Sequence, residues 1–578
     1  MKVVSSKHGQ NSADTTLSLE QEAASANDSG STVFASSLSN QSLVMTPAEK
    51  EKVKNRPKKK RKKTDSVEKV QADVSLLSSG ASLDASFSSS SSDIWTMWDS
   101  ATAADSVLAW LLGGGSTGLG VQKFFRQYWE KKPLLVPRND PAYYTGVFRT
   151  KELEEILRKE DIQYTRHLDI TRYVNDRRET LNPEGRARPA VVWQFFQEGC
   201  SIRLLNPQSY SDMVWKLCSM LQDAFSSFVG ANVYLTPAGT QGFAPHWDDI
   251  DAFMLQLEGR KHWKVYAPRC EEETLPRESS QNFSQNDLPH PPVLETELCA
   301  GDLLYVPRGF IHQASALPHT HSLHITLSVC HKNTWGELLE KVLPAALEKA
   351  ISERVELRQS LPRRYLSTMG LAFQPSADEE NLSQDAAAAE KESRQRRRFK
   401  AKLRDAMTSF TAAVMSMADA GCDQMAKEFL HSALPPVLTE NEKCCSIHAD
   451  QSYLKEGGRK KKEGLAVGSL PILTLNSRVK LIRRNLLRLC VESTEDGVEE
   501  CVRVYHCMDN SRLYRDKDPQ QFRLNNDLAG GLEYLIRSYP NYLTVAEIED
   551  VENANDKLEL CNELFKRGLL MTEEPMVN

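Results

Sequence analysis

Apolar and polar positions alternate differently in successive parts of the chain, and the pattern divides it into four segments. Residues 1–94 are rich in serine and poor in aromatic residues, so we expect a disordered tail that cannot bury enough apolar surface to fold. Residues 95–335 contain short runs in which apolar and polar residues alternate, such as "ANVYLTP" (231–237), "GDLLYVP" (301–307) and "SLHITLSVC" (322–330). Turns rich in Gly, Pro, Asn and Asp separate these runs. This texture predicts antiparallel strands in a sandwich or barrel of the jelly-roll type.

Two further runs in this segment stand on either side of a Glu-Gly-Arg sequence, "AFMLQLEG" (252–259) and "HWKVYAP" (262–268). Glycine between two apolar alternating runs favours a tight turn, so we expect these runs to form a hairpin.

After residue 335 the chain changes to a helical segment and then to a segment that mixes strands and helices. In 336–436, apolar residues recur at steps of three and four, interrupted by an acidic and alanine-rich linker at 376–391. In 437–578, strand candidates such as "SRLYRD" (511–516) alternate with helices such as "NDKLELCNELFKRGLL" (555–570), which fits a small winged-helix module.

Composition narrows the class of protein. The chain is 40% hydrophobic and 26% charged. It contains no run of ~18 apolar residues, so no membrane span is expected. The first residues lack an apolar signal core, and the 12 cysteines show no paired CxxC spacing. We therefore expect reduced thiols inside the cell rather than disulfides or a zinc ribbon.

The net charge of −6 hides a basic run, since residues 50–63 hold ten Lys or Arg and one Glu. Such a run within a disordered tail predicts nuclear import. A solvated charge run or a nucleic-acid-binding arm is the alternative, and an arginine-rich stretch at 394–404 raises the same alternatives.

Three side chains indicate a metal site. His246 and Asp248 are two residues apart, so in extended chain they present a nitrogen and an oxygen to one side. His312 follows a strand and a Pro-Arg-Gly turn and supplies a second imidazole. Two histidines and one carboxylate on one face of a metal are typical of non-haem Fe(II) oxygenases, although zinc or manganese would accept the same ligands.

Lys261 follows the first two ligands closely in sequence and is placed to face an anionic co-substrate. If that co-substrate is 2-oxoglutarate, its far carboxylate needs a cation and a hydroxyl, for which Lys261 and Thr326 are the candidates. His319, His321 and His324 crowd one region and compete with His312 as third ligand. A histidine beside an aspartate is otherwise most often a surface turn.

Several stretches resemble the JmjC ribosomal oxygenases, among them "GCSIRLLNPQSY", "GFAPHWDDIDAFMLQLEGRKHW", "GDLLYVPRGFIHQA" and "HSLHITLS". The resemblance covers about 100–578. It implies a double-stranded β-helix of the cupin-like JmjC kind, then a helical dimerisation region and a C-terminal winged helix. It also implies Fe(II) on His246, Asp248 and His312, with 2-oxoglutarate on Lys261 and O₂ as second co-substrate. The same match places Arg203, Asn232, Tyr234, Asn282 and Ser328 in the substrate pocket. Trp247 stands where the family has tyrosine, on the side away from the metal.

These sequence stretches are most similar to the nucleolar branch of this family. The resemblance therefore implies a 2-oxoglutarate-dependent dioxygenase that hydroxylates a histidine of a large-subunit ribosomal protein and demethylates histone methyl-lysine. It further implies a homo-oligomer in the nucleus, nucleolus and nucleoplasm. A non-enzymatic chromatin-associated transcriptional repressor or scaffold is the alternative.

Overall fold

The computed structural model describes residues 103–113, 119–373, 386–449, 473–493 and 500–575. The predicted disordered tail and its basic run lie outside the described residues. Within this part of the chain, no helix combines the length and the apolar character needed to cross a bilayer.

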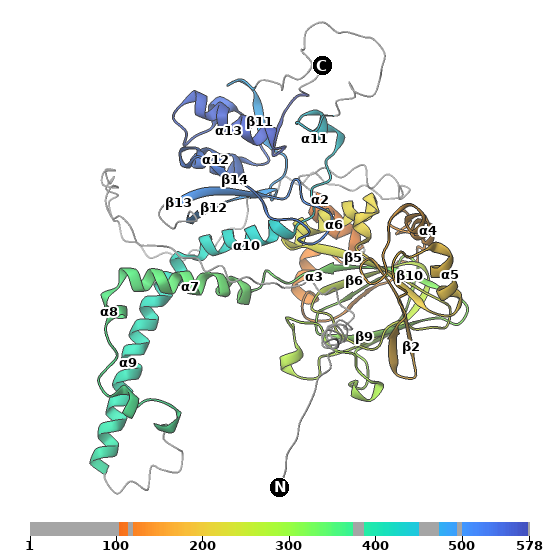
Figure 1. Ribbon diagram of the computed structural model, residues 1–578, viewed down its shortest axis with the longest axis horizontal. Coiled ribbons are helices and arrows are strands. Elements are labelled where there is room, and N and C mark those ends of the chain that lie inside the picture. The colour runs from red at the N-terminus through yellow and green to blue at the C-terminus, as the bar shows by residue number, and fades with distance from the viewer. Residues whose placement is uncertain (1–102, 114–118, 374–385, 450–472, 494–499, 576–578) are drawn as a thin grey trace, which may run out of the picture.

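The centre of the first half is a ten-stranded antiparallel arrangement (Figure 1). Its strands are β1 (Leu134–Val136), β2 (Leu168–Val174), β3 (Arg177–Thr180), β4 (Ser201–Leu205), β5 (Val229–Thr236), β6 (Asp251–Tyr266), β7 (Leu294–Cys299), β8 (Leu303–Val306), β9 (Ile311–Ala316) and β10 (Ser322–Val329). The strand order is β1-β8-β6-β10-β5-β4-β2-β3, and β7 and β9 also pair with β6. This is the predicted jelly roll.

Strand β6 corrects the hairpin expected around Gly259. Residues 251–266 form one strand, whose first half pairs with β8 and β10 and whose second half pairs with β7 and β9. Gly259 has φ +65°, and the register against β10 shifts between Leu323 and His324. The glycine is therefore a bulge that bends one strand from the first sheet into the second, not a reversal of the chain.

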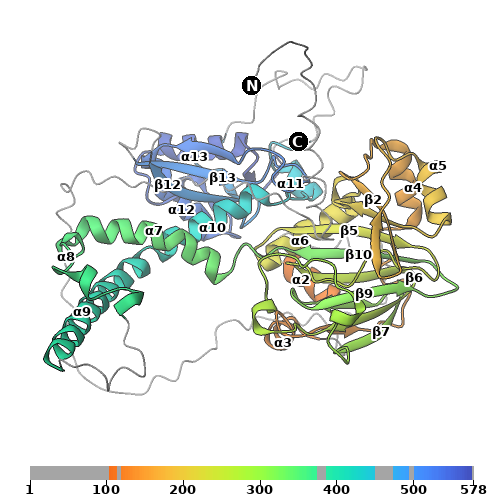
Figure 2. The same cartoon turned by 60° about the horizontal axis from the view of Figure 1, so that its bottom comes forward.

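Helices cover the outside of the strands in Figure 2. They are α2 (Ala103–Leu111), α3 (Val121–Gln127), α4 (Thr150–Lys159), α5 (Pro189–Gln197) and α6 (Asp212–Phe225). Helix α6 buries Leu217 and Leu221, and its residues join one hydrophobic core with the strands. The aromatic side chains of Phe124, Phe253 and Tyr305 fill the middle of that core.

A helical arm follows the jelly roll. Its helices are α7 (Trp335–Glu353), α8 (Val355–Arg358), α9 (Ala386–Ser416) and α10 (Ala418–Ser432). The predicted linker is shorter than expected, because α9 already begins at Ala386. Helix α10 approaches α7 closely at Gly421, where a Cβ atom would lie 2.3 Å from the Val342 side chain.

The C-terminal part has its own core and two three-stranded sheets. Its elements are α11 (Glu440–Cys444), β11 (Arg478–Leu481), β12 (Leu487–Ser493), β13 (Glu500–His506), β14 (Gln520–Leu524), α12 (Ala529–Ser538), β15 (Leu543–Thr544), α13 (Ala554–Lys566) and β16 (Leu570–Thr572). The strand expected at 511–516 is wrong. This segment is a loop because Arg512 and Tyr514 pack against the jelly roll rather than alternating along a sheet.

Candidate metal centre and co-substrate pocket

The three predicted ligands come together inside the jelly roll. His246 Nε2 lies 3.8 Å from Asp248 Oδ1, and His312 Nε2 lies 3.6 Å from Asp248 Oδ2. One donor atom from each residue falls within 4.8 Å of the other two. His246 and Asp248 lie just before β6, while His312 lies on β9. The main chains of the two histidines pair directly, with His312 N donating to His246 O at 2.8 Å.

Both imidazoles are oriented by main-chain carbonyls. His246 Nδ1 lies 2.8 Å from the oxygen of Ala244, and His312 Nδ1 lies 3.2 Å from the oxygen of Phe310. A carbonyl oxygen only accepts, so Nδ1 carries the proton in each ring. This leaves both Nε2 atoms as free lone-pair donors that face Asp248, the arrangement that metal-ligating histidines require.

The electrostatics of the triad suit a bound cation. Burial, followed by the nearby His312, lowers the pKa of His246 to about 3, so this imidazole is neutral. Burial raises the pKa of Asp248, whose Oδ1 has no hydrogen-bond partner among the described residues. A buried carboxylate without a partner is costly, and a divalent cation between it and the two Nε2 atoms removes that cost. These residues therefore fit a metal ion such as Fe(II).

Lys261 lies on the second half of β6, as a buried side chain of the jelly roll with 5% exposure. Its Nζ donates to Thr236 Oγ1 at 3.2 Å. Burial lowers the pKa of Lys261 to about 7, and no carboxylate of the described residues pairs with its ammonium group. A carboxylate of a bound co-substrate would supply the missing partner.

The hydroxyl next to Lys261 therefore belongs to Thr236, at the end of β5, where the sequence had suggested Thr326. Thr326 is buried on β10 and lies across from Asn232 of β5. It shares a face of β10 with His324, but no hydrogen bond joins it to Lys261 within the described residues.

Two further donors surround Lys261, and sequence reasoning did not identify them as such. Trp263 Nε1 and His324 Nδ1 are buried and have no hydrogen-bond partner among the described residues. The rings of Trp263 and His324 meet edge to face, with their centroids 5.4 Å apart. The Lys261 ammonium lies 5.7 Å from the Trp263 ring. Buried polar atoms without partners are rare in proteins, so this pocket fits an anionic ligand with several acceptor oxygens.

The predicted substrate-pocket residues divide into two groups. Arg203, Asn232 and Tyr234 lie together on β4 and β5, where the Tyr234 hydroxyl bonds both Arg203 and Asn232. Ser328 is buried further along β10. Asn282 is exposed in the loop between β6 and β7. This loop lies beside the segment that holds His246 and Asp248, since Phe283 N donates to Pro245 O at 2.8 Å.

This loop between β6 and β7 also holds the ligand segment in place. Trp247 N donates to Ser280 Oγ at 2.9 Å, and Ser280 N donates to Trp247 O at 3.1 Å. The Trp247 ring packs on Phe283, with centroids 5.2 Å apart. Trp247 thus occupies a small outer cluster rather than the metal pocket, as the sequence predicted.

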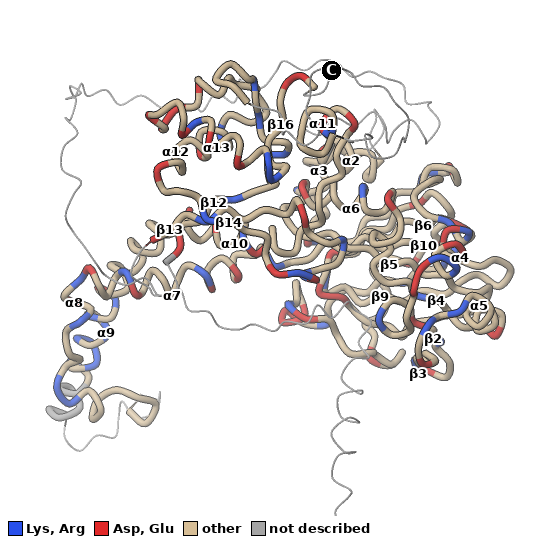
Figure 3. The backbone as a smooth tube through the Cα atoms, turned by 45° about the horizontal axis from the view of Figure 1, so that its top comes forward, with Lys and Arg blue, Asp and Glu red and all other residues tan. Residues whose placement is uncertain are grey.

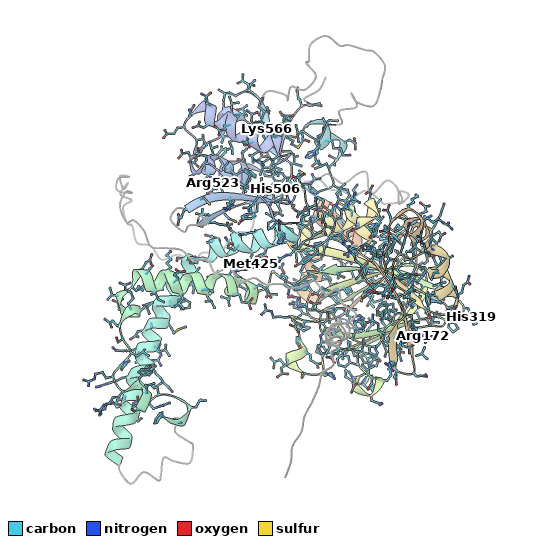
Figure 4. The ribbon with its side chains drawn as sticks, in the orientation of Figure 1. Arg172, His319, Met425, His506, Arg523 and Lys566 are labelled. Carbon is cyan, nitrogen blue, oxygen red and sulfur yellow. The ribbon has the colours of Figure 1, made fainter. Side chains whose placement is uncertain are left out.

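The competing histidines have other partners or positions. His321 Nε2 lies 3.0 Å from Glu258, and the His324 ring packs against Trp263 beside Lys261. His319 is exposed at the rim of the jelly roll (Figure 4). None of them belongs to the triad.

A second group of metal-type side chains consists of Glu130, Asp251 and His331. Both carboxylates already share a cationic partner, since Arg308 Nη1 lies 2.7 Å from Glu130 and 3.2 Å from the fully buried Asp251. The Tyr305 hydroxyl also donates to Asp251. This group is a buried ion-pair network that anchors the Pro-Arg-Gly turn before His312, and sequence spacing gave no sign of it.

Comparison with known proteins adds two matching families. A family model described as a JmjC domain matches residues 203–338, and one described as the C-terminal winged helix domain of ribosomal oxygenase 1 matches residues 434–576. Ribosomal oxygenase 1 of Danio rerio is 46% identical over 455 residues, which is 79% of this chain and 78% of that protein. The bifunctional lysine-specific demethylase and histidyl-hydroxylase NO66 of Branchiostoma floridae is 44% identical over 483 residues, 84% of this chain and 70% of that protein.

Among solved structures, the ribosomal oxygenase YcfD from Escherichia coli is similar over 79% of this chain and 98% of that chain, with 15% identity and a TM-score of 0.36.

Proposed function

Since the chain belongs to the ribosomal oxygenase family of JmjC proteins, we propose that His246, Asp248 and His312 hold its Fe(II) and that Lys261 binds its 2-oxoglutarate. The chain is a 2-oxoglutarate-dependent dioxygenase, an Fe(II) enzyme that also consumes O₂. The observation that carries the proposal is the convergence of two histidines and one carboxylate with a buried lysine in one jelly roll.

Each residue near the metal has a distinct task in this proposal. The bound iron supplies oxidation of a substrate C–H bond by O₂, coupled to decarboxylation of 2-oxoglutarate to succinate. Ala244 O and Phe310 O keep the two Nε2 atoms directed at the metal. Lys261 and Thr236 hold the far carboxylate, with Trp263 and His324 as further N–H donors. The buried pocket excludes water from the reacting groups.

The substrate is a protein side chain that reaches the metal past Arg203, Asn232, Tyr234, Asn282 and Ser328. We propose that histidine of a large-subunit ribosomal protein is the residue hydroxylated, in agreement with the names of the relatives. Arg178 and Arg203 are buried and lie 4.6 and 5.5 Å from the Phe243 ring, close to the metal-facing histidine. The Arg203 guanidinium is already paired with the buried Asp169 carboxylate, so the preference rests on residue type. Asn232 and Ser328 offer an amide and a hydroxyl, and Tyr234 is the one aromatic residue among the proposed pocket residues, which suits a neutral imidazole better than the aromatic cage of a methyl-ammonium group.

Histone methyl-lysine demethylation is the second proposed activity, favoured by the name of the Branchiostoma relative, which is a lysine-specific demethylase as well as a histidyl-hydroxylase. Incubation with a ribosomal-protein peptide and a methylated histone peptide, followed by mass spectrometry, separates the two. Gain of one oxygen atom reports hydroxylation, and loss of a methyl group with release of formaldehyde reports demethylation. An Asp248→Ala variant is the control and should produce neither.

We propose that residues 336–436 form a dimerisation region, so that the enzyme is a homo-oligomer. Helix α7 presents a stripe of exposed apolar side chains at four-residue steps, which we name the α7 stripe: Trp335, Leu339, Leu343, Leu347 and Ile351, exposed by 81%, 44%, 38%, 48% and 41%. Contiguous apolar surface of this kind marks a protein interface. A second copy covers it with the same surface.

We also propose that the protein acts in the nucleus, nucleolus and nucleoplasm, directed by the basic run at 50–63. The names of the relatives agree with this location. Microscopy of the full chain fused to a fluorescent protein tests it, because replacing this run by alanine should leave the fusion outside the nucleus. Nucleic acid is a further proposed partner of the basic runs.

A further inference from the structure

Helix α9 has two chemically different faces. Phe399, Leu403, Met407 and Phe410 recur at steps of four, four and three residues, so they share one side of the helix. Phe410 packs in a small cluster with α7, whereas Leu403 and Met407 are 53% and 52% exposed, so α7 covers only the C-terminal end of this side. Outside this apolar line lie four exposed basic residues, spread over about 160° of the helix circumference, which we name the α9 basic face: Arg397, Arg398, Lys400 and Arg404.

The charge of the α9 basic face is not balanced by neighbouring carboxylates. Among the described residues, none of these four side chains forms an ion pair, and Arg397 donates only to Ser393 Oγ, at 2.8 Å. From 394 to 416 the chain holds seven basic residues and one acidic residue, Asp405. Like charges concentrated on one helix face repel one another, which costs free energy until an anion is bound.

The position of α9 makes this face accessible. The helix extends away from the jelly roll and from the winged helix in Figure 1, and Figure 3 shows basic residues along it. The side chain of Arg396 donates to Thr368 O at 2.6 Å, which ties the preceding loop to the helix. That loop adds the exposed Arg363 and Arg364 to the same arm. If the apolar side of α9 is covered, by α7 or a second copy, the basic face still points to solvent.

We propose that the α9 basic face binds the phosphate backbone of RNA. Four cations spread over about 10 Å of rigid helix match a linear polyanion better than a single acidic side chain. The assignment to RNA rests on the proposed function, since a ribosomal-protein substrate is surrounded by RNA. The contact would hold the enzyme near that substrate without entering the active site.

Fluorescence anisotropy of the full chain with a labelled single-stranded RNA tests the surface. The basic run at 50–63 is replaced by alanine in every protein compared, so that it does not hide the effect. In this background, R397E/R398E/K400E/R404E should weaken binding at least ~10-fold at low salt. It should also reduce the slope of log affinity against log salt by about 3, as expected for four lost phosphate contacts on single-stranded nucleic acid.

The matched control is R397K/R398K/R404K, which keeps the charge and should bind RNA within about twofold of the parent. Unchanged binding by the charge-reversed variant would overturn the proposal. Displacement of RNA by polyglutamate at equal charge would also overturn it, by identifying an acidic protein as the partner.

Ultraviolet crosslinking in cells checks the source of the polyanion. The crosslinked adduct should map to α9 and disappear on treatment with ribonuclease, and an adduct removed only by deoxyribonuclease would contradict RNA. Peptide hydroxylation by the charge-reversed variant is measured in parallel and should be unchanged. Loss of RNA binding with intact turnover, and the reverse, therefore distinguish failure of this proposal from failure of the proposed function.

Discussion

At the residue scale, the co-substrate pocket is defined by donors that have no acceptor. Lys261 reaches only Thr236, and the N–H groups of Trp263 and His324 reach no described acceptor at all. Each is buried, so each loses the hydration that an exposed group would keep. A carboxylate group that accepts from all of them would recover these lost hydrogen bonds at once, as expected for the far end of 2-oxoglutarate.

Removal of single donors should therefore weaken co-substrate binding selectively. Trp263→Phe keeps an aromatic ring but deletes the N–H group, and His324→Phe does the same for the imidazole. Each change should raise the KM for 2-oxoglutarate by about 10-fold or more, the value of one hydrogen bond to a charged group. The KM for the peptide should stay unchanged. An equal rise in both constants would mean that the variants only loosen the fold.

The titration of Lys261 gives a second expectation at this scale. Its pKa is about 7 in the free pocket and must be higher beside a bound carboxylate, so binding takes up a proton. Affinity for 2-oxoglutarate should be greatest below about pH 7 and fall as the pH rises above it. Measured KM values across this range check the direction. In a Lys261→Arg variant, whose charge persists, the dependence on pH should be absent.

The same residues show how far sequence reasoning reaches. His246, Asp248 and His312 were identifiable because HxD and the Pro-Arg-Gly-Phe-Ile-His sequence are local patterns with family counterparts. Thr236 was not, because its place beside Lys261 depends on how the end of β5 meets the second sheet. A single threonine carries no sequence signal for such a contact, and Thr326 was an equally reasonable choice on residue type alone.

At the element scale, β6 determines the geometry of the site. Strand β6 begins shortly after Asp248, the predicted ligand, and carries Lys261 in its second half, so the bend at Gly259 sets the separation of these two residues. The sequence predicted two strands here. Glycine within an apolar run fits either a turn or a bulge, and Glu-Gly-Arg lacks the Asn-Gly or Asp-Gly pair that marks a two-residue hairpin.

Gly259→Ala should be strongly destabilising for two reasons. A Cβ atom there would lie 1.8 Å from His321 O, and the residue has φ +65°. The backbone conformation alone costs roughly 1–2 kcal/mol for an L-residue, and the collision adds to it. Gly185→Ala is the matched control, since Gly185 has φ +79° with no atom within 4 Å. Chemical denaturation should show a larger loss for Gly259→Ala, and equal losses would contradict a tight bulge.

The α7 stripe carries the prediction about assembly. L343D/L347D places two carboxylates in an apolar surface that a second copy should cover, and their burial without partners is unfavourable. Sedimentation velocity should show the wild-type chain as an oligomer and this variant as a monomer. Glu348→Ala, on the same helix outside the stripe, should leave the oligomer intact. A wild-type chain that is monomeric at micromolar concentration would contradict the interface.

At the scale of the whole molecule, the jelly roll and the winged helix form a direct contact. Gln222 exchanges two hydrogen bonds of 2.9 Å with the main chain of Leu434, and the rings of Phe228 and Tyr514 meet at 5.1 Å. Sequence patterns predicted both folds but not this contact. The loop at 511–516 resembles a strand in composition, and its role depends on the surface it meets.

Arg512 is the residue on which this contact should depend most. Its guanidinium lies 3.7 Å from the Trp215 ring centroid, pairs with Asp212 at 2.7 Å and donates to Gln208 O at 3.4 Å. The cation–π contact contributes about 1–2 kcal/mol, and the exposed ion pair adds little.

Arg512→Ala should therefore separate the unfolding of the two parts in calorimetry, with the winged helix melting first because its smaller core loses its support. Arg523→Ala, an exposed arginine of the same part (Figure 4), should leave a single transition. If the wild-type chain already unfolds in two independent steps, the contact transmits no stability and the site in the jelly roll works without the winged helix.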